Sequence, residues 1–321
     1  MADHDPERGG GHPSIDVLMA TYNGERFVAD QIESVLRQSY PDWKLTVRDD
    51  CSTDGTGAVV RDYARRHPDR IVVQARPTAS GSAQRNFLEM LAGSDAPYVM
   101  LCDHDDVWLE DKIAVTVARM GELEQRFGRD VPLLVHSDLI VTDPDLRVVA
   151  PSMMDAQQLD GRESRLARLI VQNVVTGCTV MVNRPLADMV REPFDGIVMH
   201  DWWLALIASA FGGIGFLERP TVLYRQHGTN TVGARPSRTL EYKVKRLLDK
   251  EGVTRSLADS FAQAQAFLEH FDARLSEEQA SMLRAYAAIP RLGKLHRLRT
   301  LRRHGFWKNT AVRRLGQILY V

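Results

Sequence analysis

Three carboxylates occur within four residues of this chain, at Asp103, Asp105 and Asp106. Like charges at this spacing repel one another, so the cluster is costly unless a cation neutralises it. Mg²⁺ and Mn²⁺ take oxygen ligands and bridge to phosphates, usually through one or two carboxylates. The cluster therefore predicts a site for a divalent cation and a diphosphate, and a solvated acidic loop is the alternative.

A second acidic pair, Asp49 and Asp50, is followed by Ser52, Thr53 and Asp54. A carboxylate at this place can accept hydrogen bonds from a ribose hydroxyl or from a base N–H. Ser, Thr and Asp are also the residues preferred at helix starts. Both interpretations hold if Asp50 points inward while Thr53 or Asp54 caps a helix.

A lone carboxylate, Asp201, comes much later in the chain, between His200 and the tryptophans Trp202 and Trp203. A carboxylate against apolar rings is harder to ionise, which moves its pKa toward values useful to a general base. A helix cap is the alternative on local grounds.

Some further side chains have weaker signals. Tyr22 is of a type that stacks on a base, and the guanidinium of Arg85 suits phosphate or base edges. An ordinary turn and a surface arginine are the simpler explanations of these two. For His227 a hydrogen-bonded loop histidine is the alternative to a ligand. Residues 176–178 fit a tight turn into a strand, with Cys178 as a small buried residue.

The elements that position these residues alternate along the chain. Apolar runs predict strands at residues 15–19, 45–47, 71–73, 98–102, 133–136 and 178–182. Helical spacing of apolar residues predicts helices at 28–36, 56–63, 87–91, 113–120 and 202–211. This order predicts an α/β fold with a mainly parallel central sheet flanked by helices. Because such sheets bind ligands at the carboxyl ends of their strands, the polar loops after the first, second and fourth strands should form one crevice.

The bulk composition narrows the class of protein. The chain has 321 residues and a net charge of −1, which is typical of a globular protein and gives no reason to expect nucleic-acid binding. Its three cysteines lie far apart, which suits a reducing cytoplasm and neither a disulfide framework nor a zinc site. We expect a disordered tail over residues 1–13, a main domain over 14–233, and no membrane span.

Residues 234–321 are expected to form a helical, basic C-terminal region. From residue 291 onward there is no acidic residue, and nine Lys or Arg are interleaved with leucines. Such a segment can lie on an anionic membrane surface, at the inner face of the plasma membrane. A helix packed on its own domain and an oligomer contact are the alternatives.

Six motifs occur together in order: 20–24, 49–56, 103–108, 173–178, 200–203 and 224–230. Together they resemble those of the family-two inverting glycosyltransferases, which have the A-type nucleotide-diphospho-sugar transferase fold. The last three resemble the bacterial rhamnosyltransferase branch. The resemblance covers residues 14–233. It implies a metal-dependent hexosyltransferase that uses a nucleotide-sugar donor, Mg²⁺ or Mn²⁺, and a glycan or lipid-linked acceptor.

The resemblance also implies residue roles. Asp201 corresponds to the general base. Nucleotide-binding residues are expected at Ala20, Tyr22, Asn23, Glu25, Asp50, Arg85 and Asp103. Metal ligands are expected among Asp103, Asp105, Asp106 and His227, and contacts to the donor or acceptor sugar at Trp108, Thr176, Gly177, His200 and Trp202. Two positions depart from the family pattern: Cys51 replaces the usual Gly, which puts the nucleotide identity in question, and His104 replaces a frequent Gln.

The implied reaction is inversion at the anomeric carbon in cell-surface polysaccharide synthesis, with L-rhamnose from dTDP-rhamnose as the first donor to consider. Galactofuranose, glucose and N-acetylhexosamine donors are alternatives. A non-catalytic nucleotide-sugar-binding subunit of an assembly complex is another. A nucleotidyltransferase is disfavoured, because the loop at residues 21–25 is not a Gly-rich phosphate loop carrying Lys or Arg.

Overall fold

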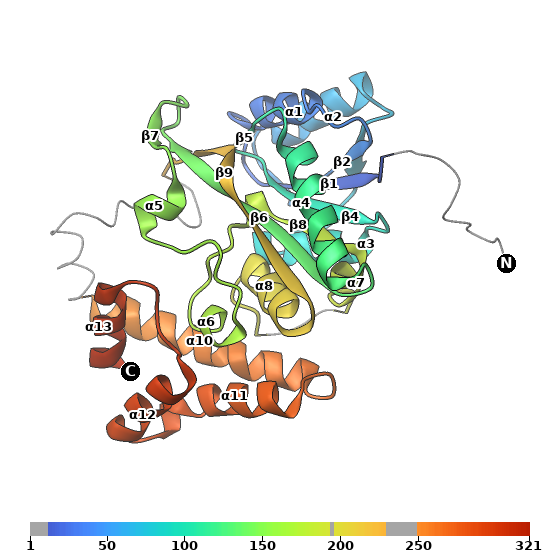
Figure 1. Ribbon diagram of the computed structural model, residues 1–321. Helices are drawn as coiled ribbons and strands as arrows, with labels where there is room; N and C mark the ends of the chain where they lie inside the picture. The colour runs from blue at the N-terminus through green and yellow to red at the C-terminus, as the bar shows by residue number, and fades with distance from the viewer. Residues whose placement is uncertain (1–11, 193–195, 229–248) are drawn as a thin grey trace.

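The computed structural model describes residues 12–192, 196–228 and 249–321. They form a nine-stranded sheet in the order β3-β2-β1-β4-β8-β6-β9-β5, with β7 paired to β6 (Figure 1). The predicted tail lies almost entirely outside the described residues. The predicted domain boundary after residue 233 and the motif residues 229 and 230 also lie outside them.

The first four strands are parallel, as the alternation of strands and helices predicts. The strands are β1 (Ile15–Thr21), β2 (Trp43–Asp49), β3 (Ile71–Gln74) and β4 (Tyr98–Asp103). The helices between and after them are α1 (Val28–Leu36), α2 (Thr56–Arg66), α3 (Ala83–Gly93) and α4 (Lys112–Phe127). All five helices predicted from apolar spacing are present.

Helices cover both faces of the sheet. Side chains of β1 alternate between two hydrophobic clusters: Val17 and Met19 pack with α1, α2 and α4, whereas Leu18 and Ala20 pack with α3. This alternation follows from the period of two in a strand, which sends successive side chains to opposite faces. A sheet buried on both faces has near-continuous apolar strands, which is why these strands were readable from the sequence.

The second half of the sheet is mixed. β8 (Met181–Asn183) is antiparallel to β4 and β6 (Leu133–Thr142), and β9 (Gly213–Arg225) is parallel to β6. The short strands β5 (Val107–Trp108) and β7 (Val148–Ala150) pair antiparallel with β9 and β6. The prediction of a strand over 178–182 was wrong in its first half, because residues Gly177–Thr179 form a 3-10 turn. The long strand β9 was not predicted.

The remaining elements are helical. Short helices α5 (Met153–Gln157), α6 (Leu166–Leu169) and α7 (Arg184–Asp188) precede the buried helix α8 (His200–Phe211). The C-terminal helices are α10 (Lys250–Phe271), α11 (Glu277–Ala287), α12 (Lys294–His304) and α13 (Ala311–Tyr320), with the 3-10 turn η2 (Ile289–Arg291). Among the described residues, no helix combines the length and apolar character needed to cross a bilayer.

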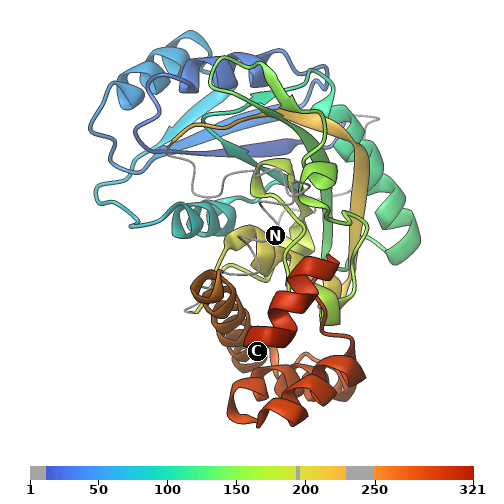
Figure 2. The same ribbon diagram turned by 90° about the vertical axis from the view of Figure 1, so that its left-hand side faces the viewer.

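The predicted helical C-terminal extension packs directly on the main domain. It lies on the side of the molecule opposite α1 and α2 (Figures 1 and 2). The ring of Trp203 in α8 meets that of Phe267 in α10 edge-on, with centroids 5.2 Å apart. The amide of Gln279 in α11 donates to the carbonyl of Ala210. The hydrophobic cluster around α3 and α8 continues without a break into Leu301 and Phe306, so both parts share one core.

Candidate active site

The polar loops after β1, β2 and β4 lie at one edge of the sheet. Ala20 pairs with Asp103 in the β1–β4 ladder, and Thr21 pairs with Asp49 in the β1–β2 ladder. Each strand therefore ends beside its neighbour. This register brings the loops after these strands to one edge of the sheet, where the crevice was predicted.

The loops after β1 and β2 are bound to each other. The side-chain oxygen of Asn23 accepts from the Thr53 amide at 2.9 Å, and Glu25 Oε2 accepts from the Gly55 amide at 2.9 Å. Asn23 and Glu25 thus hold the two loops in place. Tyr22 directly precedes Asn23, and its side chain is 56% exposed, as a ring that stacks on a base would be.

Asp50 points inward, as expected, and is buried. Its carboxylate accepts from the amide of Ser80 at 2.6 Å and from the Ser80 hydroxyl at 2.7 Å, and it pairs with Arg76 Nε at 3.1 Å. Asp54 accepts from the amide of Thr56 at 3.0 Å, although Gly55 occupies the N-cap position of α2. The expectation that Thr53 or Asp54 caps this helix was therefore wrong, since Gly55 is the N-cap and no side chain caps it. The expected contact of Asp50 with a base or ribose stays a prediction.

Arg85 lies on the surface at the start of α3. Its side chain is 70% exposed and pairs with Glu89 at 2.9 Å. Glu89 also binds Arg76, which in turn reaches Asp50. Arg85 is therefore connected to Asp50 through two charged side chains, and its guanidinium keeps a large exposed surface.

Gly24 allows the close approach of His104. A Cβ at Gly24 would come within 2.0 Å of the His104 ring, which contacts the Ala20 carbonyl through Nδ1 at 3.3 Å. The histidine that departs from the family pattern thus packs the acidic loop against the loop after β1.

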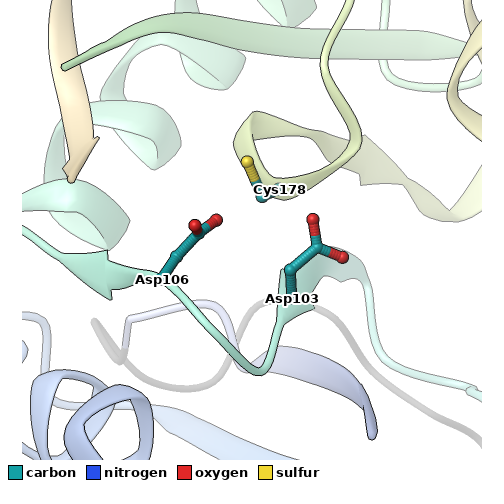
Figure 3. Close-up of side chains that lie close together, drawn as sticks. All are labelled: Asp103, Asp106 and Cys178. Carbon is teal, nitrogen blue, oxygen red and sulfur yellow. The ribbon is translucent and has the colours of Figure 1, made fainter. Parts of the chain in front are cut away.

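The acidic cluster occupies the loop between β4 and β5. Figure 3 shows Asp103 and Asp106 at the two ends of this loop, with Cys178 facing them. The ligand atoms of these three residues lie within 4.8 Å of one another. Asp105 Oδ2 lies 2.8 Å from His227 Nε2, and the His227 ring stacks on Phe27. Of the four predicted metal ligands, Asp103 and Asp106 thus lie together with Cys178, whereas Asp105 and His227 form a pair of their own.

The carboxylates of the cluster are hard to ionise. Burial, followed by the charges of Asp105 and Asp201, raises the pKa of Asp103 to about 7. Burial and the charges of Asp105 and Asp103 raise the pKa of Asp106 well above its ordinary value. A bound cation would reverse both effects, because it favours the ionised form.

Asp106 is the most deeply placed of these carboxylates, with no exposed surface. Its Oδ1 accepts from the Arg225 amide at 3.0 Å. No described residue makes a hydrogen bond of ordinary geometry to its Oδ2, and the Cys178 thiol lies beside it. An orphaned buried carboxylate oxygen fits a hard divalent cation, which takes oxygen ligands.

Asp201 starts α8 and is buried. Its carboxylate accepts from the amides of Gly177 at 3.1 Å and Trp202 at 2.6 Å, and from the side chain of Asn173 at 3.2 Å. Burial raises the pKa of Asp201 to about 6, although these three donors oppose the shift. Oδ2 has a single donor, so it retains capacity to accept a proton.

Asp201 and the acidic cluster belong to one site. Gly177 donates to Asp201, while the next residue, Cys178, faces Asp103 and Asp106. The charge of Asp201 is also one of the causes of the raised pKa of Asp103. Residues nearly 100 positions apart in the sequence are thus assembled as the hypothesis of a single catalytic centre requires.

Four of the residues expected to contact the donor or acceptor sugar are close to Asp201 in the sequence or in the turn that donates to it. Trp202 donates through Nε1 to the Leu169 carbonyl at 2.6 Å, and His200 stacks on Phe87. Burial lowers the pKa of His200 to about 4, so its ring is neutral at pH 7. Gly177 leaves room for this ring, since a Cβ there would lie 2.8 Å from His200 Nε2. Thr176 is partly exposed at the start of the same turn.

Trp108 is placed differently. It is 2% exposed and lies in the core behind the cluster, with the ammonium of Lys112 over its ring at 4.7 Å. Its burial leaves no face for a sugar, so its position favours a packing role over a direct sugar contact.

Two residues of the site lie within the sequence motifs, but the sequence predicts no role for either of them. Asn173 donates to Asp201, and Arg225 donates its amide to Asp106 and its guanidinium to Asp30 at 2.9 Å. The pairing of β9 with β5 brings Arg225 to the cluster. Apart from the position of each residue within a motif, no local sequence pattern indicates these contacts.

Comparison with known proteins agrees with this geometry. Residues 16–127 match the profile of the family described as glycosyl transferase family 2. This segment is a family 2 glycosyltransferase domain. The match contains the loops after β1, β2 and β4 and ends with α4.

Similar proteins extend the likeness beyond the matched segment. The dTDP-rhamnosyl transferase RfbG of Shigella flexneri is 25% identical over 70% of this chain and 77% of its own length. The glucosyltransferase WfgD of Escherichia coli, which uses UDP-Glc, is 26% identical over 60% of this chain and 69% of its own length. The putative teichuronic acid glycosyltransferase TuaG of Bacillus subtilis is 28% identical over 64% of this chain and 77% of its own length.

The fold has a solved counterpart. The S. aureus TarS fragment 1–349, crystallised with UDP-GlcNAc, superposes with a TM-score of 0.54 and 16% identity. The superposition covers 95% of this chain and 90% of that one. It includes the C-terminal helices as well as the sheet, and so confirms the A-type fold.

Proposed function

We propose that the chain is a metal-dependent, inverting glycosyltransferase of cell-surface polysaccharide synthesis, acting at the cytoplasmic side. It transfers a sugar from a nucleotide-sugar to an acceptor hydroxyl. The observation that carries this proposal is the placement of Asp201 beside the acidic cluster, with Gly177 and Cys178 joining the two. A base and a diphosphate site must be adjacent for one displacement to use both.

The nucleotide would lie over the loops after β1 and β2. The exposed ring of Tyr22 stacks on the base. Asp50, with its partners Arg76 and Ser80, forms the inner wall of the nucleotide site. Ala20, Asn23 and Glu25 fix these loops, and Asp103 reaches the ribose from the end of β4. Arg85 supplies positive charge at the rim.

Asp201 acts as the general base. It accepts the proton of the acceptor hydroxyl as that oxygen attacks the anomeric carbon, and the bond from that carbon to the nucleoside diphosphate breaks. A pKa of about 6 leaves Asp201 mostly ionised at pH 7 and close to the pH at which it works. Asn173 and the Gly177 amide hold the carboxylate in one orientation.

Asp103, Asp105, Asp106 and His227 would hold Mg²⁺ or Mn²⁺. When bound, the cation neutralises the charge that grows on the leaving diphosphate. The His227 ring is fixed by stacking on Phe27, and Asp106 is fixed by the Arg225 amide. These contacts position the ligands before the cation arrives, which lowers the cost of binding.

For the donor we propose dTDP-L-rhamnose first. It is supported by the motifs of the rhamnosyltransferase branch and by the similarity to RfbG over 70% of the chain. UDP-glucose is the second candidate, because WfgD is similar at nearly the same level. The acceptor would be a glycan or a lipid-linked saccharide.

A thermal-shift screen of nucleotide-sugars with Mg²⁺ or Mn²⁺ tests the proposal. A donor at 100 times its Kd should stabilise the fold by about 2.7 kcal/mol. The stabilising donor should then be hydrolysed slowly without acceptor. Stabilisation without any hydrolysis or transfer would instead identify a non-catalytic binding subunit, and no stabilisation by any nucleotide-sugar would overturn the proposal.

A further inference from the structure

Exposed aliphatic side chains gather on the last two helices. Leu295 of α12 is 71% exposed, and Leu315, Ile318 and Leu319 of α13 are 45%, 36% and 50% exposed. We call these four residues the α12–α13 patch. The other large hydrophobic residues exposed among the described residues lie on α4, β3, β7 and the loop after β1, away from these two helices.

The orientation of α13 is fixed by its inner face. Gln317 is fully buried, donates to the Phe306 carbonyl at 2.8 Å and accepts from the Lys308 amide at 3.1 Å. Gly316 faces Val253 of α10. A helix with a buried glutamine and outward leucines has the reverse of the usual polarity. Positions 311, 315, 318 and 319 share the outer face by their helical spacing.

A lysine brings the two helices together. Lys294 Nζ, at the start of α12, donates to the carbonyl of Leu319 at 2.8 Å and to that of Val321 at 3.0 Å. Leu295 therefore lies near the exposed end of α13. Along α12, Arg299 and Arg302 are exposed and share the face of Leu295, at spacings of four and seven residues.

The surroundings of the patch are cationic. Residues 291–321 contain nine Lys or Arg and no Asp or Glu, although the whole chain has a net charge of −1. Besides the two arginines of α12, the exposed cations there are Arg291, Lys294, Arg303 and Arg314. Positive charge is thus concentrated around the only apolar surface of this region of the described chain.

We propose that the α12–α13 patch docks on an anionic lipid surface. Amphipathic helices with aliphatic residues and a basic rim lie in the headgroup region, held by apolar burial and by attraction to anionic lipids. A second copy of this chain is a poorer partner, because a two-fold contact would bring the same arginines face to face. The inference goes beyond the proposed function and does not depend on the donor.

Vesicle co-sedimentation of the full chain tests the docking. The wild-type protein should sediment with phosphatidylglycerol vesicles, should remain in solution with phosphatidylcholine vesicles, and should be released by high salt. Leu315→Ser with Leu319→Ser should lower the partition coefficient about tenfold. Arg299→Gln with Arg302→Gln should lower it by about tenfold and reduce its salt dependence.

Val148→Ser with Val149→Ser is the matched control. These valines are 60% and 59% exposed on β7, away from the patch, and their replacement should leave sedimentation unchanged. Circular dichroism and thermal unfolding without any ligand verify that every variant is folded. Three results would overturn the proposal: no sedimentation of the wild type, equal sedimentation of all variants, or a concentration-dependent dimer that the leucine variant alone abolishes without any vesicle binding.

Discussion

Two groups of carboxylates lie at the same edge of the sheet and are treated in opposite ways. Asp50 is surrounded by donors, with two hydrogen bonds from Ser80 and an ion pair with Arg76. Asp106 has one backbone donor and an orphaned oxygen. Asp103 has the charges of Asp105 and Asp201 for neighbours. The protein itself supplies hydrogen-bond and ion-pair partners to Asp50. The carboxylates of the acidic cluster would need a bound cation to balance their charge.

This difference in partners distinguishes a structural role for Asp50 from a chemical role for the acidic cluster. A buried carboxylate with an arginine partner stabilises the loop that carries the arginine. Buried carboxylates that repel one another, such as Asp103 and Asp106, have raised pKa values, and such groups are typical of functional sites. The comparison predicts that substitutions in the two groups will have effects of a different kind as well as of a different size.

The largest expected effect is at Asp201. Asp201→Asn keeps the shape but replaces one carboxylate oxygen by an NH2 group that cannot accept a proton, so the rate of transfer should fall by about 10²–10⁴-fold. Donor affinity, measured by thermal shift, should stay within about twofold. A variant that kept more than a tenth of the transfer rate would show that another group is the base. Asp62→Asn, on the exposed face of α2, serves as the control.

Next in size is the metal dependence of nucleotide binding. Asp105→Asn combined with Asp106→Asn should weaken binding of the nucleoside diphosphate in Mn²⁺ by about 10–100-fold. Binding without metal should be unchanged, because the proposed base and ribose contacts come from other residues, Tyr22, Asp50 and Asp103. Isothermal titration with and without Mn²⁺ measures both. If the double variant kept the metal-dependent gain, the cation would have to bind elsewhere.

The same substitution should act with opposite signs in the two groups. Asp50→Asn removes the charge that Arg76 requires and should lower the free energy of unfolding by about 1.5–3 kcal/mol. Asp103→Asn removes repulsion with Asp105 and Asp201, so the metal-free protein should become more stable at pH 8. Urea unfolding in chelator measures the two changes. Equal signs would contradict the comparison.

The pH dependence follows from the same shifts. The pKa of Asp103 is about 7 in the folded chain, against an ordinary value of 3.8. Between these values the folded state holds a proton that the unfolded state has lost, so this contribution to stability declines as the pH rises from about 4 to about 7. His136 and His200, whose pKa values burial lowers to about 4, act in the opposite direction.

A comparison of two proteins isolates the aspartate. The difference in unfolding free energy between wild type and Asp103→Asn should grow as the pH rises from 5 to 8 in chelator, because both proteins retain the two histidines. Mn²⁺ should remove most of this difference in the wild type, since it competes with protons for the carboxylates. A pH-independent difference would mean that Asp103 is not strained by its neighbours.

The first half of the fold was predictable because its central strands β1 and β4 are buried on both faces. Continuous apolar runs such as residues 98–102 identify these strands, and helical spacing identifies the helices between them. β9 was not predicted. Its exposed Glu218 and Arg219 and its Pro220 interrupt the apolar pattern, and the β6–β9 ladder shifts register there. Pairing with β6 and β5, both far away in the sequence, makes this segment a strand.

The proximity of Asp201 to the acidic cluster was predictable and the individual contacts were less so, while the roles of these residues stay predictions. The sequence and the family resemblance indicated the acidic cluster and Asp201. Neither indicated that Asn23 and Glu25 would be used to join two loops, nor that Trp108 would be buried. Such contacts depend on the distance between segments that are far apart in the chain, which local patterns do not encode.

The smallest expected effect concerns the turn that presents Asp50. Cys51 has φ of 63°, in the left-handed region, where a Cβ costs about 1–2 kcal/mol and glycine costs little. This explains in physical terms why glycine is usual at this position in the family that the sequence resembles. Glycine also increases the entropy of the unfolded chain, which offsets about 0.5–1 kcal/mol of the gain.

Cys51→Gly should therefore raise the free energy of unfolding by about 0.5–1 kcal/mol. Cys51→Ala is the matched control, because it removes the thiol but keeps the Cβ in the left-handed region, so it should give no gain. The thiol makes only a long contact with the Arg76 carbonyl, at 3.9 Å, and its loss should matter little. If alanine stabilised the protein as much as glycine, the thiol rather than the backbone would be the source of strain. A gain for glycine alone would mean that the protein tolerates a strained turn next to Asp50, where the carboxylate is otherwise fully supplied with partners.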